Sequence, residues 1–228
     1  MPRLKASLGA SAGTIVFGME DGTVSIFGLV FGVAATTTSS VAVLVAGASG
    51  AAAAAISMMA GAYLDAETSR DERTARRTRL EADLAANHAD IAAQLSNRLA
   101  VAGLTPPQSA ALAGAVQHDP AALTGLLVAL QAAPDGQLNP LEQALWILLA
   151  DFLSAAVPIT PFVFFPIAQA RFVSAAITIM LLVALGVGRA QIGKRRIARA
   201  IVETVSMGVT AALAGVALGM LIDRSLGG

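Results

Sequence analysis

The stretch Gly13–Thr36, GTIVFGMEDGTVSIFGLVFGVAAT, is apolar along almost its whole length but carries two adjacent acids, Glu20 and Asp21. About 20 apolar residues suffice for a helix to cross a bilayer, so this stretch predicts a membrane-spanning helix. A carboxylate in hydrocarbon is costly unless it is neutral, paired or turned toward a wet cavity, and such groups persist mainly where a pathway needs them. We therefore predict that Asp21 has a function in the membrane.

Small side chains follow Asp21 along one face of this helix. Ser25, Gly28 and Gly32 lie at helical spacings from it, so a neighbouring backbone can approach closely or a narrow pathway can form there. The alternative is a neutral Asp21 hydrogen-bonded to a neighbouring helix. Glu20 lies about 100° around the axis from Asp21, so the two acids cannot share one narrow site on a regular helix. For Glu20, a neutral or interface-seeking side chain and a functional one are equally open.

The composition is that of an integral membrane protein. Of 228 residues, 56% are hydrophobic and 13% are charged, and the mean hydropathy is +0.70, far from the averages of soluble proteins. The 15 basic and 15 acidic residues balance, which gives no indication of a nucleic-acid partner. The sequence lacks cysteine and contains no Walker loop, dinucleotide fingerprint, HExxH or GxSxG motif. We expect a protein of the lipid bilayer that is not an enzyme and holds no cofactor.

Four further apolar runs predict spans. They cover Val41–Leu64, about Pro140 to Phe152, Phe172–Val187 and Ala200–Ile222. The third run ends in VPITPFVFFP, where prolines are expected to turn the helix into irregular backbone. The fold class predicted is therefore an all-α membrane protein with five transmembrane helices.

A polar insert separates the second and third spans. Its first part is rich in helix formers, so the second span should continue out of the membrane as a long helix, which Gly103 ends. Thr105–Pro106 and Asp119–Pro120 predict the starts of two more helices. The predicted domains are residues 1–64 with spans one and two, 65–137 as a three-helix insert, and 138–228 with spans three to five.

Basic residues are distributed unevenly between the two sides of the predicted membrane. The N-terminal tail, the insert and the loop Gly188–Arg199 hold thirteen of the fifteen, leaving Arg171 and Arg224 opposite. By the positive-inside rule, the N-terminus and the insert face the cytoplasm and the C-terminus lies outside. The high content of Ala, Gly and Arg is typical of a GC-rich bacterium, so the expected location is a bacterial plasma membrane.

Three more side chains in the predicted spans are candidates for a cation pathway. Asp151 either joins Asp21 in a wet pathway or sits neutral between helices. Glu203 begins a polar line in the fifth span, or instead pairs with Arg199 four residues earlier. Met58 lies on a small-residue face of the second span. Its thioether would be a soft ligand for transition metals, although most methionines in apolar helices only fill space.

Taken together, several motifs resemble the vacuolar iron transporter family. They are GMEDG (18–22), AISMMAGAYLDAETSRDE (55–72), VPITPF (157–162) and IVETVSMG (201–208), and the likeness covers nearly the whole chain. The resemblance implies a homodimer of five-span chains with a three-helix cytoplasmic insert, which exchanges cytosolic Fe²⁺, often also Mn²⁺, for protons. It implies that Asp21 and Met58 are the pathway aspartate and methionine, and it matches Glu203 to a Glu-Thr pair at the start of the last span.

The sequence departs from the family pattern where metal would bind. A second pathway carboxylate is replaced here by Gly50, and we hypothesise that Asp151 takes its place. Basic and aliphatic side chains stand at the ligand positions of the insert, with only Glu81 and Asp83 nearby, so the cytoplasmic metal site is expected to be absent or weak. Those side chains are Arg76, Arg77, Arg79 and Leu80 on its first helix and Leu126, Leu127 and Val128 on its third, where the neutral Gln131 stands at a further such position.

The leading prediction is a homodimeric antiporter that removes Fe²⁺ or Mn²⁺ from the cytosol in exchange for protons. Its candidate metal residues are Asp21, Met58, Glu203, Glu20 and Asp151. Two alternatives remain open. The same fold could carry another solute, or the chain could be a non-transporting scaffold whose Arg70–Arg79 cluster docks a partner or anionic lipid.

Overall fold

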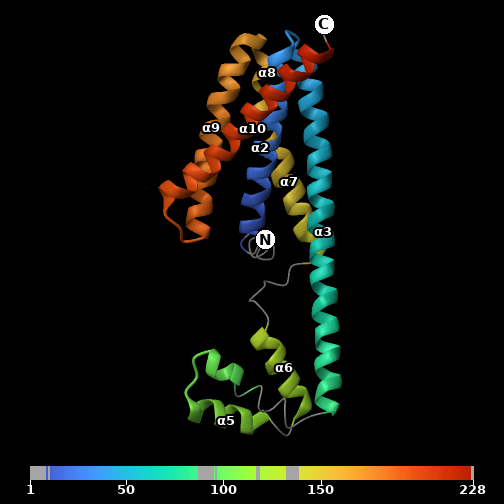
Figure 1. Cartoon of the computed structure of the whole chain (residues 1–228), viewed down its shortest axis with the longest axis vertical. Coiled ribbons are helices and arrows are strands. Elements are labelled where there is room, and N and C mark those ends of the chain that lie inside the picture. The colour runs from blue at the N-terminus through green and yellow to red at the C-terminus, as the bar shows by residue number, and fades with distance from the viewer. Residues whose placement is uncertain are drawn as a thin grey trace. The chain divides into compact units, whose positions relative to one another are not determined.

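The computed structural model describes residues 11–86, 97–116, 119–131 and 139–226, together with Gly9 and Leu95. In this part of the chain all regular structure is helical (Figure 1). Five helices are long and apolar enough to cross a membrane, which confirms the all-α membrane class. Their bounds are α2 Ala12–Thr36, α3 Ser40–Ala86, α7 Pro140–Ile159 continued by α8 Pro161–Phe164, α9 Ile167–Ile192 and α10 Ile197–Leu226.

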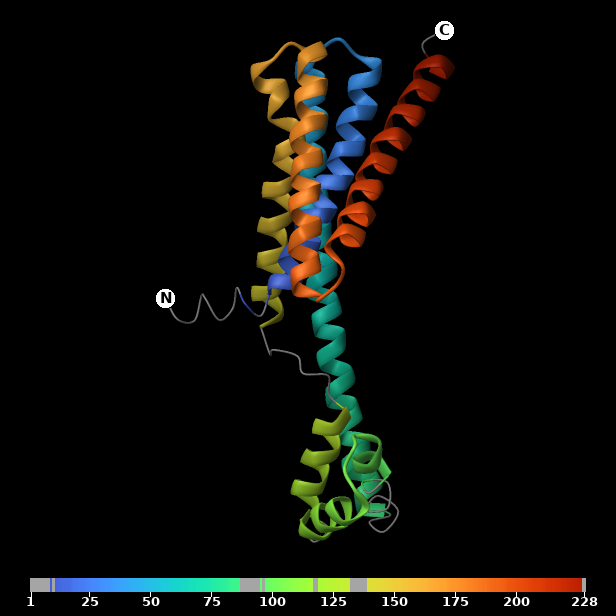
Figure 2. The ribbon, with the colours of Figure 1, turned by 90° about the vertical axis from the view of Figure 1, so that its left-hand side faces the viewer.

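The chain divides into two compact units, which are described separately. One comprises residues 1–64 and 138–228, and the other comprises residues 65–137. In the first unit α2 packs against α7, α9 and α10, and Gly47 of α3 lies against Val30 of α2. Figure 2 shows α10 along one edge of this unit, next to α2.

Successive spans run in opposite directions. Gly18 of α2 lies against Ile147 of α7, and Gly22 lies against Asp151, so these two helices are parallel. Arg171 near the start of α9 reaches the carbonyl oxygens of Ala34 and Thr37 at the C-terminal end of α2, so α9 is antiparallel to α2. Through these contacts the guanidinium caps orphan carbonyls at that helix end.

The small-residue face of α2 predicted from the sequence packs tightly against α10. A Cβ atom on Gly28 would lie 2.8 Å from the carbonyl oxygen of Ala211, and one on Gly32 would lie 2.8 Å from that of Gly215. Without side chains at these positions, the two backbones can approach closely. Of the two alternatives for this face, the structure shows the close approach of a neighbouring backbone at Gly28 and Gly32.

The third span differs from the prediction at its proline-rich end. Helix α7 does not turn irregular at Pro158 but includes it and ends at Ile159. The Ser174 hydroxyl of α9 donates to the Pro158 carbonyl oxygen at 2.7 Å, so a tertiary contact provides a partner for the backbone there. The chain leaves the helices at Thr160, before α8, and at Phe165 and Pro166, after it.

In the second unit, α3 extends to Ala86, so the second span continues beyond Leu64 as a helix. Its predicted course from there to Gly103 crosses residues 87–94, which lie outside the described residues. Gly103 has a φ of +94°, the left-handed conformation typical of a helix end. The Asp119 carboxylate accepts from the backbone N–H of Ala121 and Ala122 and so caps the next helix. The unit also contains α5 Pro106–Val116 and α6 Pro120–Gln131, and residues 97–101 are helical as well. The small core consists of Leu95, Leu99, Leu123 and Leu127.

Candidate cation site in the membrane-spanning helices

The side chain of Asp151 lies against the backbone of α2. A Cβ atom on Gly22 would lie 2.8 Å from Oδ1 of Asp151 and 2.9 Å from Oγ of Ser154. Glycine at position 22 therefore makes room for a carboxylate from α7 directly beside the residue that follows Asp21. This contact requires the parallel packing of α2 and α7, which also brings Gln143 of α7 to Thr14 of α2.

Asp151 is completely buried, with 0% of its surface exposed. Neither of its carboxylate oxygens has a hydrogen-bond partner among the residues that the structure describes. The nearby charge that acts on it is that of Asp21. A buried acid without a partner is unfavourable for folding, so a functional reason for its presence is more economical than a structural one.

Asp21 itself is half-buried and directly precedes Gly22 in α2. Its backbone carbonyl accepts from the Ser25 hydroxyl, but within the described ranges its carboxylate forms no hydrogen bond and no ion pair. The structure thus places two acids from different spans close together, without a compensating basic side chain on Asp21. The alternative of an Asp21 hydrogen-bonded to a neighbouring helix has no support in these contacts.

Met58 lies on the face of α3 that packs against the bundle. Ala51 and Ala55 on that face are buried, and Met58 is half-buried. Gly50 of α3 contacts Leu29 and Ile26 of the antiparallel α2. Eight residues further along α3, Met58 is therefore at the level of residues 18–21 of α2, because both helices rise by about 1.5 Å per residue. Its role as a metal ligand stays a prediction.

Glu20 has partners on two other spans. Its Oε1 accepts a hydrogen bond from the Thr204 hydroxyl of α10 at 2.9 Å. Its Oε2 lies 3.6 Å from Nη1 of Arg189 on α9, and only 14% of the Glu20 side chain is exposed. Both oxygens are therefore engaged in this structure. That Glu20 binds metal remains a prediction, and these contacts favour a different role.

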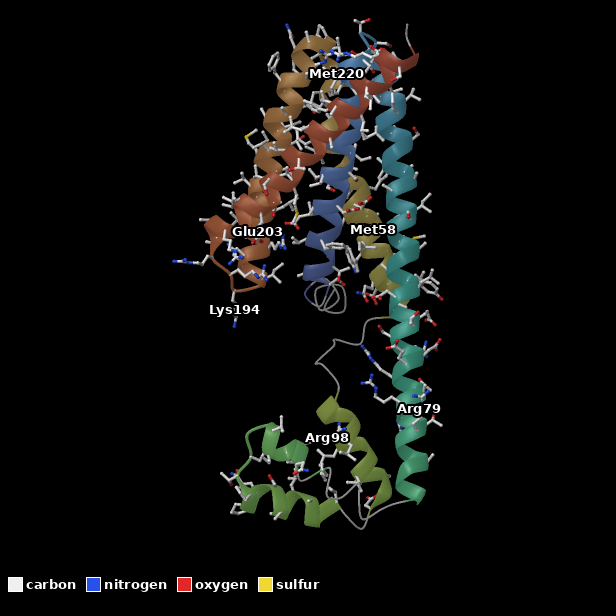
Figure 3. All side chains as sticks on the ribbon, viewed as in Figure 1. Met58, Arg79, Arg98, Lys194, Glu203 and Met220 are labelled. Carbon is white, nitrogen blue, oxygen red and sulfur yellow. The ribbon has the colours of Figure 1, made fainter. Side chains whose placement is uncertain are left out.

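Glu203 lies near the start of α10, as labelled in Figure 3. Its carboxylate pairs with Nε of Arg199 at 3.0 Å and with Nη1 of Arg195 at 3.8 Å. The pairing with Arg199 that the sequence suggested as an alternative is confirmed. A metal role for Glu203 stays a prediction, and it would require competition with two arginines.

The structure therefore separates the five candidates into different surroundings. Asp151 lies against Gly22, the residue after Asp21, at the α2–α7 contact, whereas Glu20 and Glu203 are held by arginines. Within the described ranges no group of three or more His, Cys, Asp or Glu side chains could hold a metal ion. The candidate site is thus a pair of carboxylates. In the insert, the side chains of Glu81 and Asp83 lie outside the described residues, so the weakness of its metal site stays a prediction.

Sequence reasoning missed Arg189 and Thr204 as partners of Glu20. Arg189 was read only as part of a basic loop, yet it lies inside α9, in the last turns of that helix. Thr204 is 1% exposed, which means that α10 turns it toward the bundle. A signal was present in the sequence, since a polar residue beside Glu203 on an apolar helix needs a partner within the bundle.

The fold is that of a helical integral membrane protein, with Asp151 of α7 buried against Gly22, the residue after Asp21 in α2. The chain belongs to the VIT family, whose model matches residues 12–220. It is 29% identical to the vacuolar iron transporter of Centaurea cyanus over 210 residues, which are 90% of this chain and 85% of that protein. It is 28% identical to vacuolar iron transporter 1 of Arabidopsis thaliana over 214 residues, 92% and 85% of the two chains. These matches confirm the family resemblance, and the relatives' names agree with the prediction of a protein that is not an enzyme.

Proposed function

We propose that this protein transports divalent metal ions, Fe²⁺ or Mn²⁺, across the membrane in exchange for protons. The observation that carries the proposal is the buried carboxylate of Asp151, which has no hydrogen-bond partner among the residues that the structure describes and lies against Gly22, the neighbour of Asp21 in α2. The match to proteins named vacuolar iron transporters supports a metal ion as the solute.

The proposed exchange follows from charge balance in an apolar surrounding. Two ionised carboxylates close together are strongly unfavourable in low dielectric. A divalent cation bound by both would neutralise them, and in its absence protons would do so. Each metal ion that binds then displaces protons from Asp21 and Asp151, and each release of metal takes protons up again. The same two side chains therefore couple the two fluxes.

The other ligands set the preference among cations. Carboxylate oxygens suit hard ions such as Mn²⁺, whereas a thioether favours softer transition metals. Met58 at the level of Asp21 would thus bias the site toward Fe²⁺ and away from Mg²⁺ or Ca²⁺. With Gly50 at the position of the family's second carboxylate, Asp151 supplies the missing charge from α7.

The side on which metal enters is inferred from the sequence. The positive-inside rule puts the insert and the α9–α10 loop in the cytoplasm, and the family resemblance implies that the metal leaves the cytosol. A homodimer is the family's implied assembly. The matched relatives are plant proteins named as vacuolar, whereas our expectation of a bacterial plasma membrane rests on composition.

Uptake of Mn²⁺ into proteoliposomes tests this function. With an acidic lumen and the membrane potential clamped, uptake should be several times faster than without a pH gradient, because outflowing protons drive metal inward. Equal rates with and without the gradient would contradict proton exchange. Absence of Fe²⁺ and Mn²⁺ uptake under both conditions would favour the other-solute or scaffold alternatives.

A further inference from the structure

The two neighbouring acids of α2 have opposite surroundings. Glu20 receives the Thr204 hydroxyl on one oxygen and the Arg189 guanidinium near the other. The carboxylate of Asp21, one residue on, has no hydrogen bond or ion pair within the part of the chain that the structure describes. Sequence alone gives no reason for this difference, because both residues are acids in the same apolar helix.

Arg189 reaches Glu20 from α9, which runs antiparallel to α2. Helix α9 is antiparallel to α2, so its last turns return to the level at which α2 carries its acids. A guanidinium stays protonated under all relevant conditions. About a third of the Arg189 side chain is exposed, compared with 14% of Glu20. The Glu20 charge is therefore balanced within the protein before any metal ion arrives.

We propose that Arg189 is a tethered counter-ion that withholds Glu20 from the transported cation and restricts the cation site to Asp21 and Asp151. Arg189 is thus a positioning residue that acts through Glu20. This inference rests on the proposed function, because it concerns which acids of the same pathway meet the metal. Under this proposal, Glu20 helps to hold α2, α9 and α10 together.

Removal of the Arg189 charge has a specific consequence under this proposal. Glu20 would keep only Thr204 as a partner, and its negative charge would lie next to Asp21 on α2. A divalent ion at Asp21 would then be attracted by a further unbalanced carboxylate. Because the attraction scales with both charges and is little screened away from water, Mn²⁺ should bind Arg189→Gln on the order of tenfold more tightly than the parent chain.

The test is Mn²⁺ binding to the purified full chain in detergent, measured by calorimetry. Arg189→Gln should bind more tightly, and Arg189→Gln with Glu20→Gln should return to about the parental affinity. Arg189→Lys, which keeps the charge, should also bind like the parent. Arg196→Gln removes an exposed charge from the adjacent loop and should leave binding unchanged. Where the glutamine variant does not fold, Arg189→Met serves as the neutral variant.

Three results would overturn the inference. One is unchanged or weaker Mn²⁺ binding by folded Arg189→Gln, as expected if Arg189 only stabilises the bundle. Another is tighter binding that persists in the double variant, which would mean that Glu20 is not the withheld acid. The third is tighter binding by Arg196→Gln as well, which would indicate a general charge effect. Asp21→Asn, measured alongside, tests the proposed function separately, since loss of binding there together with no effect of Arg189 leaves the function standing and this inference refuted.

Discussion

Asp21→Asn is expected to lower Mn²⁺ uptake into proteoliposomes by at least about a hundredfold, since a charge opposing a divalent ion in low dielectric contributes several kcal/mol. Asparagine has nearly the shape of aspartate but can neither carry the charge nor exchange a proton. The side chain has no ion pair among the described residues, so the substitution should leave the fold intact. Uptake and the melting temperature in detergent are measured on the same preparation.

Asp223→Asn is the matched control for this variant. Asp223 is an exposed acid in the last turn of α10, and its substitution should leave uptake at the parental rate. If Asp21→Asn transports as fast as the parent, the membrane carboxylate has no part in transport. If it loses uptake only together with a large fall in melting temperature, the loss reflects unfolding.

Asp151→Leu is expected to abolish pH-driven Mn²⁺ uptake while making the protein more stable. The carboxylate is 0% exposed and has no hydrogen-bond partner among the described residues, so an apolar side chain with the same branching removes an unfavourable burial. The free energy of unfolding should rise by about 1–3 kcal/mol. Such an opposition of stability and activity is typical of a residue retained for function.

Glu142→Gln, in the first turn of the same helix, provides the comparison for Asp151→Leu. It removes an exposed acid from the first turn of α7, more than two helical turns from Asp151, so uptake should persist. A destabilised Asp151→Leu protein would show that the buried acid has a structural role. A stabilised variant that still transports Mn²⁺ with a pH gradient would remove Asp151 from the proposed exchange.

The sequence was sufficient for features that depend on local chemistry. The lengths of the apolar runs predicted the five spans, and the absence of glycine and proline from the segment after Leu64 predicted the long extension of α3. The cap at Asp119 and the stop at Gly103 also follow from local preferences. Pro158 shows the limit of such rules, because α7 includes this proline and ends only at Ile159. The Pro158 carbonyl oxygen then accepts a hydrogen bond from the Ser174 hydroxyl of α9.

The candidate site could be predicted only in part. An acid within an apolar run identified Asp21 and Asp151 as unusual residues. Their placement near each other depends on how α2 packs against α7, where Gly22 contacts Asp151 although the two residues are 129 positions apart in the sequence. The same holds for Glu20, whose partners lie on α9 and α10. The residue pattern along one helix shows which side chains share a face. It does not show which residues of another helix pack against that face.

The position of the bound metal tests the central claim most directly. Crystals of the full chain soaked in Mn²⁺ should show an anomalous-scattering peak between α2 and α7, within bonding distance of Asp21 and Asp151, and this peak should be lost in Asp21→Asn. A peak beside Glu203 or in the insert, with none at the paired acids, would contradict the account.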